Sequence, residues 1–231
     1  MSNRLIGLVG IVVILGIAVA LSSNRKASNL RIVGAAFALQ AAVAAFVIYL
    51  PAGQVIIESM SEVVLNIMGY SRVGIEFIFG GLATEESVAS FAINVLPMIV
   101  FFSALMSVLY HIGIMQFVVR LVGGALRWVI GTRAVESLNA AANIFIGQTE
   151  APLVVRPYLK HLTEAQMFAV MVSGVASIAG TVMLAYVQFG AELKYLLAAS
   201  FMAAPGGLLM AKIIMPDEDE ESPAEDDAHL R

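Results

Sequence analysis

The stretch that decides the fold is residues 143–157, Asn-Ile-Phe-Ile-Gly-Gln-Thr-Glu-Ala-Pro-Leu-Val-Val-Arg-Pro, in which the polar tip 148–150 separates two apolar arms. A carboxylate at bilayer depth is costly unless it faces a cavity, a partner or a ligand. Gly147 can end one short helix, Thr149 can N-cap the next, and Pro152 is tolerated in a first turn. The stretch therefore predicts a helical hairpin that enters the membrane and turns back, with its tip lining a cavity. A cytoplasmic loop that joins two ordinary helices is the alternative.

The composition of the whole chain indicates a membrane protein. Its 231 residues are 60% hydrophobic and its mean hydropathy is +0.89, which excludes an ordinary soluble domain. The absence of cysteine excludes disulfides and thiolate metal sites. Eight of the 17 acidic residues lie between Asp217 and Asp227. This like-charge run predicts a solvated, disordered tail over 217–231, to which we assign no function.

The hydrophobic runs predict an all-α membrane protein. Residues 54–68 alternate apolar and acidic positions and are predicted to form an interfacial helix rather than a span. The charge-free run 88–119 is longer than one crossing needs and predicts a single tilted or extended helix, which Pro97 can kink. We expect residues 1–21 to be a retained helix rather than a cleaved signal peptide. The predicted spans are 5–21, 30–50, 88–119, 165–190 and 193–215.

The positions of the basic residues predict the orientation. With the N-terminus outside, nine Lys/Arg residues fall on the cytoplasmic side, against Arg4, Arg72 and Lys194 outside. Charges on both sides of the hairpin then share one compartment, so the hairpin must enter and leave from the cytoplasm. The nine cytoplasmic residues are Arg25, Lys26, Arg31, Arg120, Arg127, Arg133, Arg156, Lys160 and Lys212.

A small, weakly polar helix face is predicted over 171–188, where Ser173, Ser177 and Gly180-Thr181 recur at helical spacing. Close helix packing explains Gly174 and Gly180. A local break near 177–178 would free carbonyl groups to coordinate a cation beside the Ser177 hydroxyl. Sodium is a hard ion that takes oxygen ligands, so the Asn143 amide and a carbonyl at the end of the first hairpin arm suit it too. Residues 205–207, Pro-Gly-Gly, are expected to interrupt or kink the last span.

Three segments resemble the concentrative nucleoside transporter family. Residues 143–157 are similar to the first hairpin motif of that family, and Ala-Ser-Ile-Ala-Gly at 176–180 to its fourth transmembrane helix. Residues 198–212, Ala-Ala-Ser-Phe-Met-Ala-Ala-Pro-Gly-Gly-Leu-Leu-Met-Ala-Lys, are similar to its fifth. With the opening helices, the resemblance extends from the N-terminus to about residue 216. The Gly-Gln-Thr-Glu-Ala-Pro motif within it is specific.

The resemblance implies a sodium-coupled nucleoside symporter of the inner membrane, with no catalytic residues, no cofactor other than sodium as coupling ion, and no nucleic-acid partner. Residues 1–119 would supply scaffold helices, and 120–216 the hairpin and transport-domain helices of one inverted repeat, within a homotrimer. Thr149 favours the sodium-coupled branch, since some proton-coupled relatives carry Ser there. The implied nucleoside contacts are Gln148, Thr149, Glu150 and Val182, and the implied sodium ligands are Asn143, Ser177 and the carbonyls of Ile146 and Ile178.

One departure from the family keeps other hypotheses open. Family members are close to twice this length, and the half that supplies a second hairpin is not in this sequence. Either the gene is truncated, or that half is a separate chain, or the protein is a non-transporting membrane subunit. An intramembrane hydrolase using Glu150 with His111 or His161 is disfavoured, because the sequence has no His-Glu-x-x-His and no Gly-x-Ser-x-Gly.

Overall fold

The structure is a computed structural model that describes residues 3–83 and 88–218, and every regular element in these ranges is a helix. This confirms the predicted all-α fold, while the acidic tail beyond Glu218 lies outside the described residues. The helices are α1 (Asn3–Ala20), α2 (Leu30–Tyr49), α3 (Pro51–Phe79), η1 (Gly80–Ala83), α4 (Val88–His111), α5 (Ile114–Ile130), α6 (Ala134–Asn143), α7 (Ala151–Val154), η2 (Arg156–His161), α8 (Glu164–Ala176), α9 (Gly180–Gln188) and α10 (Leu193–Ile214).

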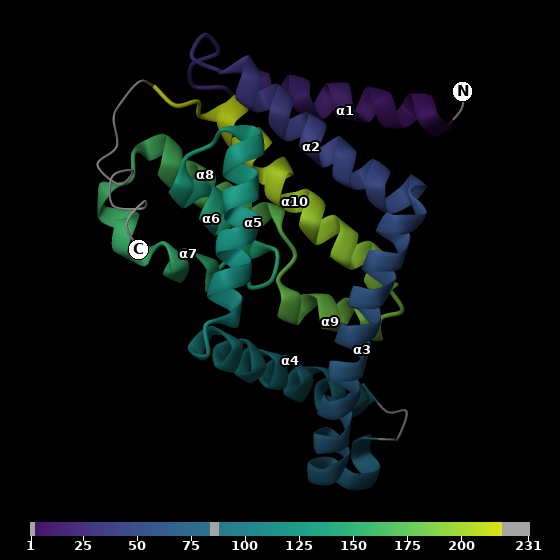
Figure 1. Cartoon of the computed structure of the whole chain (residues 1–231). Helices are drawn as coiled ribbons and strands as arrows, with labels where there is room; N and C mark the ends of the chain where they lie inside the picture. The colour runs from purple at the N-terminus through teal and green to yellow at the C-terminus, as the bar shows by residue number, and fades with distance from the viewer. Residues whose placement is uncertain (1–2, 84–87, 219–231) are drawn as a thin grey trace.

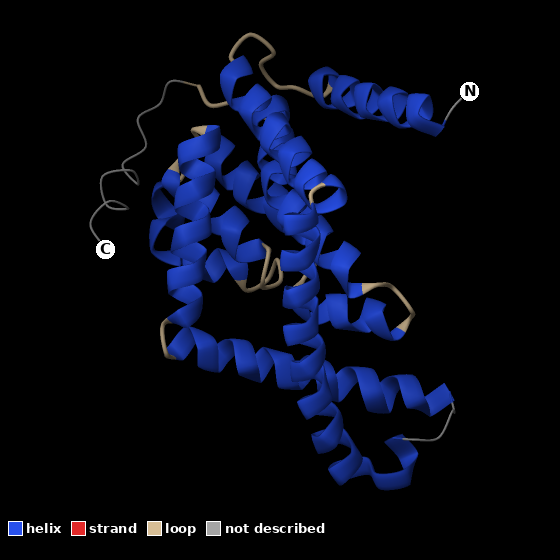
Figure 2. Ribbon diagram, turned by 45° about the vertical axis from the view of Figure 1, so that its right-hand side comes forward, coloured by secondary structure: helices blue, strands red, loops and turns tan. Residues whose placement is uncertain are grey.

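The helices divide into a packed group and an open frame around it (Figure 1). Helices α5, α6, α8 and α10 lie together, while α3 extends away from them and α4 returns at a steep angle to α5. Figure 2, turned by 45°, shows the same arrangement and no strand among the residues it describes. The main apolar core joins α2, α5, α6 and α10, and includes Ala36, Val119, Ala140 and Leu208.

Within the described ranges, four helical segments are long and apolar enough to cross a membrane: Leu30–Tyr49, Pro51–Ala83, Ala92–His111 and Leu193–Ile214. The predicted spans 30–50 and 193–215 thus match α2 and α10 closely. The interfacial helix predicted over 54–68 is part of a longer helix, α3, whose length and composition would also suit a crossing. Its position relative to the bilayer stays a prediction.

Two predicted single helices are each two helices in the structure. The run 88–119 breaks after His111, because Gly113 adopts a left-handed conformation with φ of 88° and α5 starts beyond it. The run 165–190 is divided into α8 and α9 by the non-helical residues 177–179. The prediction of one helix over 88–119 was wrong, since an apolar composition does not reveal a backbone break, whereas the break within 165–190 lies where the sequence analysis placed it.

Residues 205–207 do not break the last span, and the kink predicted there stays a prediction. Helix α10 continues through Pro205, and the two glycines after it allow other helices to approach closely. A Cβ atom on Gly206 would lie 2.8 Å from the Gln40 amide nitrogen of α2, and one on Gly207 would lie 3.0 Å from Ser173 Cα of α8. Small residues at these two positions therefore let α10 pack between α2 and α8.

Candidate cation and nucleoside site at the helical hairpin

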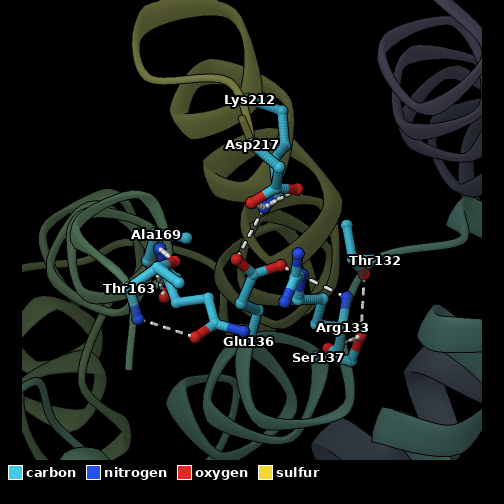
Figure 3. Close-up of polar contacts among 10 residues, drawn as sticks. Thr132, Arg133, Glu136, Ser137, Thr163, Ala169, Lys212 and Asp217 are labelled. Atoms are coloured by element: carbon cyan, nitrogen blue, oxygen red, sulfur yellow. Dashed lines mark hydrogen bonds and ion pairs between the residues drawn. The ribbon is translucent and has the colours of Figure 1, made fainter. Parts of the chain in front are cut away.

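The segment from α6 to η2 folds as a hairpin that leaves and returns to one end of the molecule. Asn139 of α6 contacts Val170 and Ser173 of α8, and one turn later Asn143 lies beside Gly174, so α6 and α8 run in the same direction. Figure 3 accordingly places Thr163, which precedes α8, near Glu136 in the first turns of α6. The chain between these two helices must therefore turn and come back, while the position of this turn within a membrane stays a prediction.

A buried ion pair joins the base of the hairpin to α10 (Figure 3). Lys212 Nζ lies 2.6 Å from Glu136 Oε1, and the two side chains are 2% and 0% exposed. Asp217, just beyond α10, accepts from the same ammonium group at 2.7 and 2.8 Å. The second carboxylate oxygen of Glu136 accepts from the Arg133 backbone N–H, before the start of α6. Each charge thus has a partner, which buried charges require.

The hairpin tip is formed by the exposed residues Gln148, Thr149 and Glu150. Glu150, and not Thr149 as predicted, is the residue before α7, and no side chain caps that helix. Glu150 Oε2 instead accepts from the Gly147 backbone N–H at 2.9 Å, so the carboxylate stabilises the turn that carries it. Pro152 lies in the first turn of α7, as predicted. Glu150 also lines a cavity of about 740 Å³ between the hairpin, α4 and α5.

Asn143, at the end of α6, carries a buried polar atom without a partner. Its side chain is 1% exposed, and its Nδ2 donates to the Asn139 carbonyl at 3.0 Å. Because a carbonyl can only accept, the amide nitrogen must face Asn139 and Oδ1 must point the other way. Oδ1 has no hydrogen-bond partner among the described residues. It is one of eight such atoms among the described residues, and a bound ion or ligand is one explanation for it.

The helix break predicted near 177–178 is confirmed. Ser177, the residue after α8, has an extended backbone (φ −97°, ψ 159°), and α9 starts at Gly180. The last carbonyl groups of a helix have no partner within that helix. The Ser177 hydroxyl donates to one of them, the Gly174 carbonyl, at 3.1 Å. Its oxygen lone pairs are left for another donor or for a cation.

The hairpin turn packs directly against this helix break. A Cβ atom on Gly180 would collide with the Phe145 carbonyl oxygen, and one on Gly147 would lie 3.3 Å from the Ala179 Cβ. A Cβ on Gly174 would lie 3.1 Å from the Gln148 Cβ and 3.9 Å from Asn143 Oδ1. The close packing predicted for Gly174 and Gly180 is therefore present, and each contact is with the hairpin turn.

These contacts place the hairpin turn against the helix break and leave the predicted nucleoside residues exposed. Asn143 Oδ1 lies beside the last turn of α8, which is followed by Ser177, while Ile146 belongs to the turn that meets the break. Ile178 lies within the break itself, between Ser177 and Ala179. Val182, in the first turn of α9, is 43% exposed. No histidine is among the residues that line the cavity next to Glu150.

The sequence prediction missed two features of the site. Glu136 and Lys212 are 76 residues apart and no motif links them, although a lysine and a glutamate within apolar helices signal that each needs a partner. Asn139 was not singled out either. Its spacing of four residues from Asn143, on one face of a short helix, is the signal that could have identified it.

Comparisons with known proteins identify the family. Residues 9–82 match the family described as Na⁺-dependent nucleoside transporter N-terminus, and residues 92–193 match the one described as nucleoside recognition. The chain belongs to the concentrative nucleoside transporter family. It corresponds to the N-terminal half of that family's proteins.

Individual relatives agree with this assignment. The chain is 53% identical to an uncharacterized transporter of Haemophilus influenzae over 92% of this chain and 52% of the relative. It is 44% identical to the nucleoside permease NupC of Helicobacter pylori over 94% of this chain and 53% of the relative. The solved structure of CNTnw in an inward-facing, substrate-bound state matches with a TM-score of 0.90 at 47% identity, over 99% of this chain and 59% of that one. The chain therefore spans about half the length of these curated relatives.

Proposed function

We propose that this chain provides the cation site and one wall of the nucleoside site of a sodium-coupled nucleoside symporter. The observation that carries the proposal is the buried, unpartnered Oδ1 of Asn143 beside the last turn of α8. An amide oxygen of this kind, next to a broken helix, offers the oxygen ligands that a hard monovalent cation takes.

The proposed ligands are Asn143 Oδ1, the Ser177 hydroxyl oxygen and the carbonyls of Ile146 and Ile178. All four are neutral, which suits an ion of single charge that must also be released during transport. The sodium dependence named in the description of the matching family supports sodium over protons. Proton coupling is the alternative, and it would leave the Asn143 oxygen without an ion.

The nucleobase is proposed to bind at the hairpin tip, through hydrogen bonds to Gln148, Thr149 and Glu150 and packing against Val182. A carboxylate and two neutral polar groups can pair with donors and acceptors on the edge of a base. All four side chains are exposed in the structure, so one wall alone would leave bound nucleoside open to water. We therefore propose that residues outside these 231, from the same or a separate polypeptide, supply the opposite wall, within the homotrimer that the family resemblance implies.

The proposed location is the inner membrane, with the N-terminus outside. This proposal is supported by contacts that bring several segments with basic residues to the C-terminal end of α10. There the Ser23 backbone N–H, from the loop between α1 and α2, donates to the Ile214 carbonyl at 2.8 Å. Lys212 at the same end contacts the start of α6. The basic residues near these segments would then share the cytoplasmic side, in keeping with the positive-inside rule.

The test compares the unfolding temperature of the purified chain in sodium, potassium and choline chloride. We expect sodium alone to raise it, since a ligand that binds only the folded state stabilises that state. Asn143→Ala should raise the sodium concentration needed for half of the effect by about tenfold or more, the loss expected for one interaction with a charged group. Asn66→Ala is the matched control, because Asn66 is exposed on α3. Equal unfolding temperatures in the three salts would overturn the sodium assignment.

A further inference from the structure

A hydrogen-bonded bridge between α6 and α8 lies one helical turn before the proposed cation site. Asn139 Nδ2 donates to Ser173 Oγ at 2.9 Å and to the Val170 carbonyl at 3.1 Å. The Asn139 side chain is 0% exposed and that of Ser173 is 1% exposed. The Val170 carbonyl can only accept, so the amide nitrogen of Asn139 must face α8. The bridge is therefore a directional contact between the two helices.

On both helices, the residue that forms the bridge precedes the proposed cation ligand by the same number of residues. Asn139 precedes Asn143 by four residues, and Ser173 precedes Ser177 by four residues. Residues four apart lie on the same face of a helix, and α6 and α8 run in the same direction. The contact between Asn139 and Ser173 must therefore set both the separation and the relative rotation of the helix ends that carry Asn143 and Ser177.

Asn139 also orients the Asn143 side chain directly. Its backbone carbonyl accepts from Asn143 Nδ2 at 3.0 Å, which turns Oδ1 away from the helix and toward Gly174. Ser173 is held in turn by α8, since its hydroxyl lies 2.7 Å from the Ala169 carbonyl. Gly207 of α10 packs closely against the Cα of Ser173. Ser173 is thus held in place by its surroundings.

We infer that Asn139 and Ser173 are positioning residues for the cation site: they hold the Asn143 amide oxygen and the Ser177 hydroxyl at the correct separation before the ion binds. This inference rests on the proposed sodium site. An amide that is already ordered loses little conformational freedom on binding. Without the bridge, ordering must accompany binding, at a cost of about two- to tenfold in affinity for one immobilised side chain.

The test measures the sodium midpoint, the sodium concentration that gives half of the sodium-dependent rise in unfolding temperature of the purified 231-residue chain in a choline chloride background. We expect Ser173→Ala and Asn139→Ala each to raise this midpoint about two- to tenfold. The double variant should raise it no further than the larger single effect, because both substitutions remove the same bond. Ser200→Ala is the matched control, because it removes a fully buried hydroxyl that has no hydrogen-bond partner among the described residues.

Different outcomes would overturn the proposed sodium site and the positioning role of Asn139 and Ser173. Wild-type chain without any sodium effect would overturn the sodium site itself. A normal wild-type midpoint that Ser173→Ala and Asn139→Ala leave unchanged would overturn only the positioning role, as would two effects that multiply in the double variant. If a variant unfolds at a lower temperature in choline chloride while its sodium midpoint is unchanged, the bond stabilises the fold without positioning the cation ligands, and the positioning role is overturned. If Asn139→Ala does not fold, Ser173→Ala decides the question alone, since it removes one oxygen atom as the control does.

Discussion

At the scale of single residues, the hairpin tip gives Glu150 two separate tasks. Its Oε2 accepts from the Gly147 backbone N–H, and its position on the cavity leaves the carboxylate open to a ligand. Glutamine is nearly isosteric and its amide oxygen can still accept from Gly147. Substitution by glutamine should therefore preserve the turn while changing what the tip offers to a nucleoside.

We predict that Glu150→Gln keeps the fold and lowers nucleoside affinity about ten- to a hundredfold, because a hydrogen bond to a charged group contributes roughly 1.5–3 kcal/mol. The measurement is uridine and adenosine binding to a transport-competent assembly that carries this chain. Glu62→Gln, an exposed position on α3, is the control for the chemical change. Affinities equal to those of the wild type would show that the tip does not touch the substrate.

At the scale of helices, the packing of α6 against α10 depends on a charge pair buried in an otherwise apolar interface. Glu136 and Lys212 are both excluded from water, with Asp217 as a third, partly exposed member. Removing one partner of such a pair leaves an uncompensated charge, which costs about 3–5 kcal/mol. Replacing both by apolar side chains of similar volume is often neutral or stabilising.

We predict that Lys212→Met lowers the free energy of unfolding by about 3–5 kcal/mol, and that adding Glu136→Leu recovers most of the loss. Unfolding of the purified chain by denaturant, followed by its helical circular dichroism, measures both. Lys194→Met is the control, since the Lys194 side chain is 40% exposed and its pair with Glu192 contributes little. A double variant as unstable as Lys212→Met would argue that the pair is not the source of the effect.

The helices also show what the sequence could and could not predict. Uninterrupted apolar runs predicted α2 and α10 within a residue or two at each end, because length and composition alone define such spans. The polar tip of the hairpin was recognisable because polar residues are costly in a membrane, whereas the nucleoside contacts rest on the family resemblance and stay predictions. The break at Gly113 and the pairing of Glu136 with Lys212 were not recognisable, since one depends on a single backbone conformation and the other on tertiary contact.

At the scale of the whole molecule, the contacts among the hairpin, α8 and α10 show which helix ends lie at the same end of the structure. The start of α6, the start of α8 and the end of α10 lie at one end of the molecule, as the pairing of Glu136 with Lys212 and the position of Thr163 show (Figure 3). Helix α10 is long enough to cross a membrane, so its first residues, and the end of α9 just before them, lie at the opposite end of the molecule.

The chain has no cysteine, so single introduced cysteines can map these sides without a background. We predict that Lys26→Cys and Lys160→Cys, both at exposed positions, react with a membrane-impermeant maleimide only after the cells are opened. Gln188→Cys, exposed at the end of α9, should react in intact cells. Lys26 lies in the connection between α1 and α2, and Lys160 lies in the returning arm of the hairpin. If both are protected from the reagent in intact cells, they lie on the same side of the membrane, as a hairpin that turns back requires. Labelling of Lys160→Cys in intact cells, with Lys26→Cys still protected, would mean that the segment crosses the membrane, and the re-entrant arrangement would have to be abandoned.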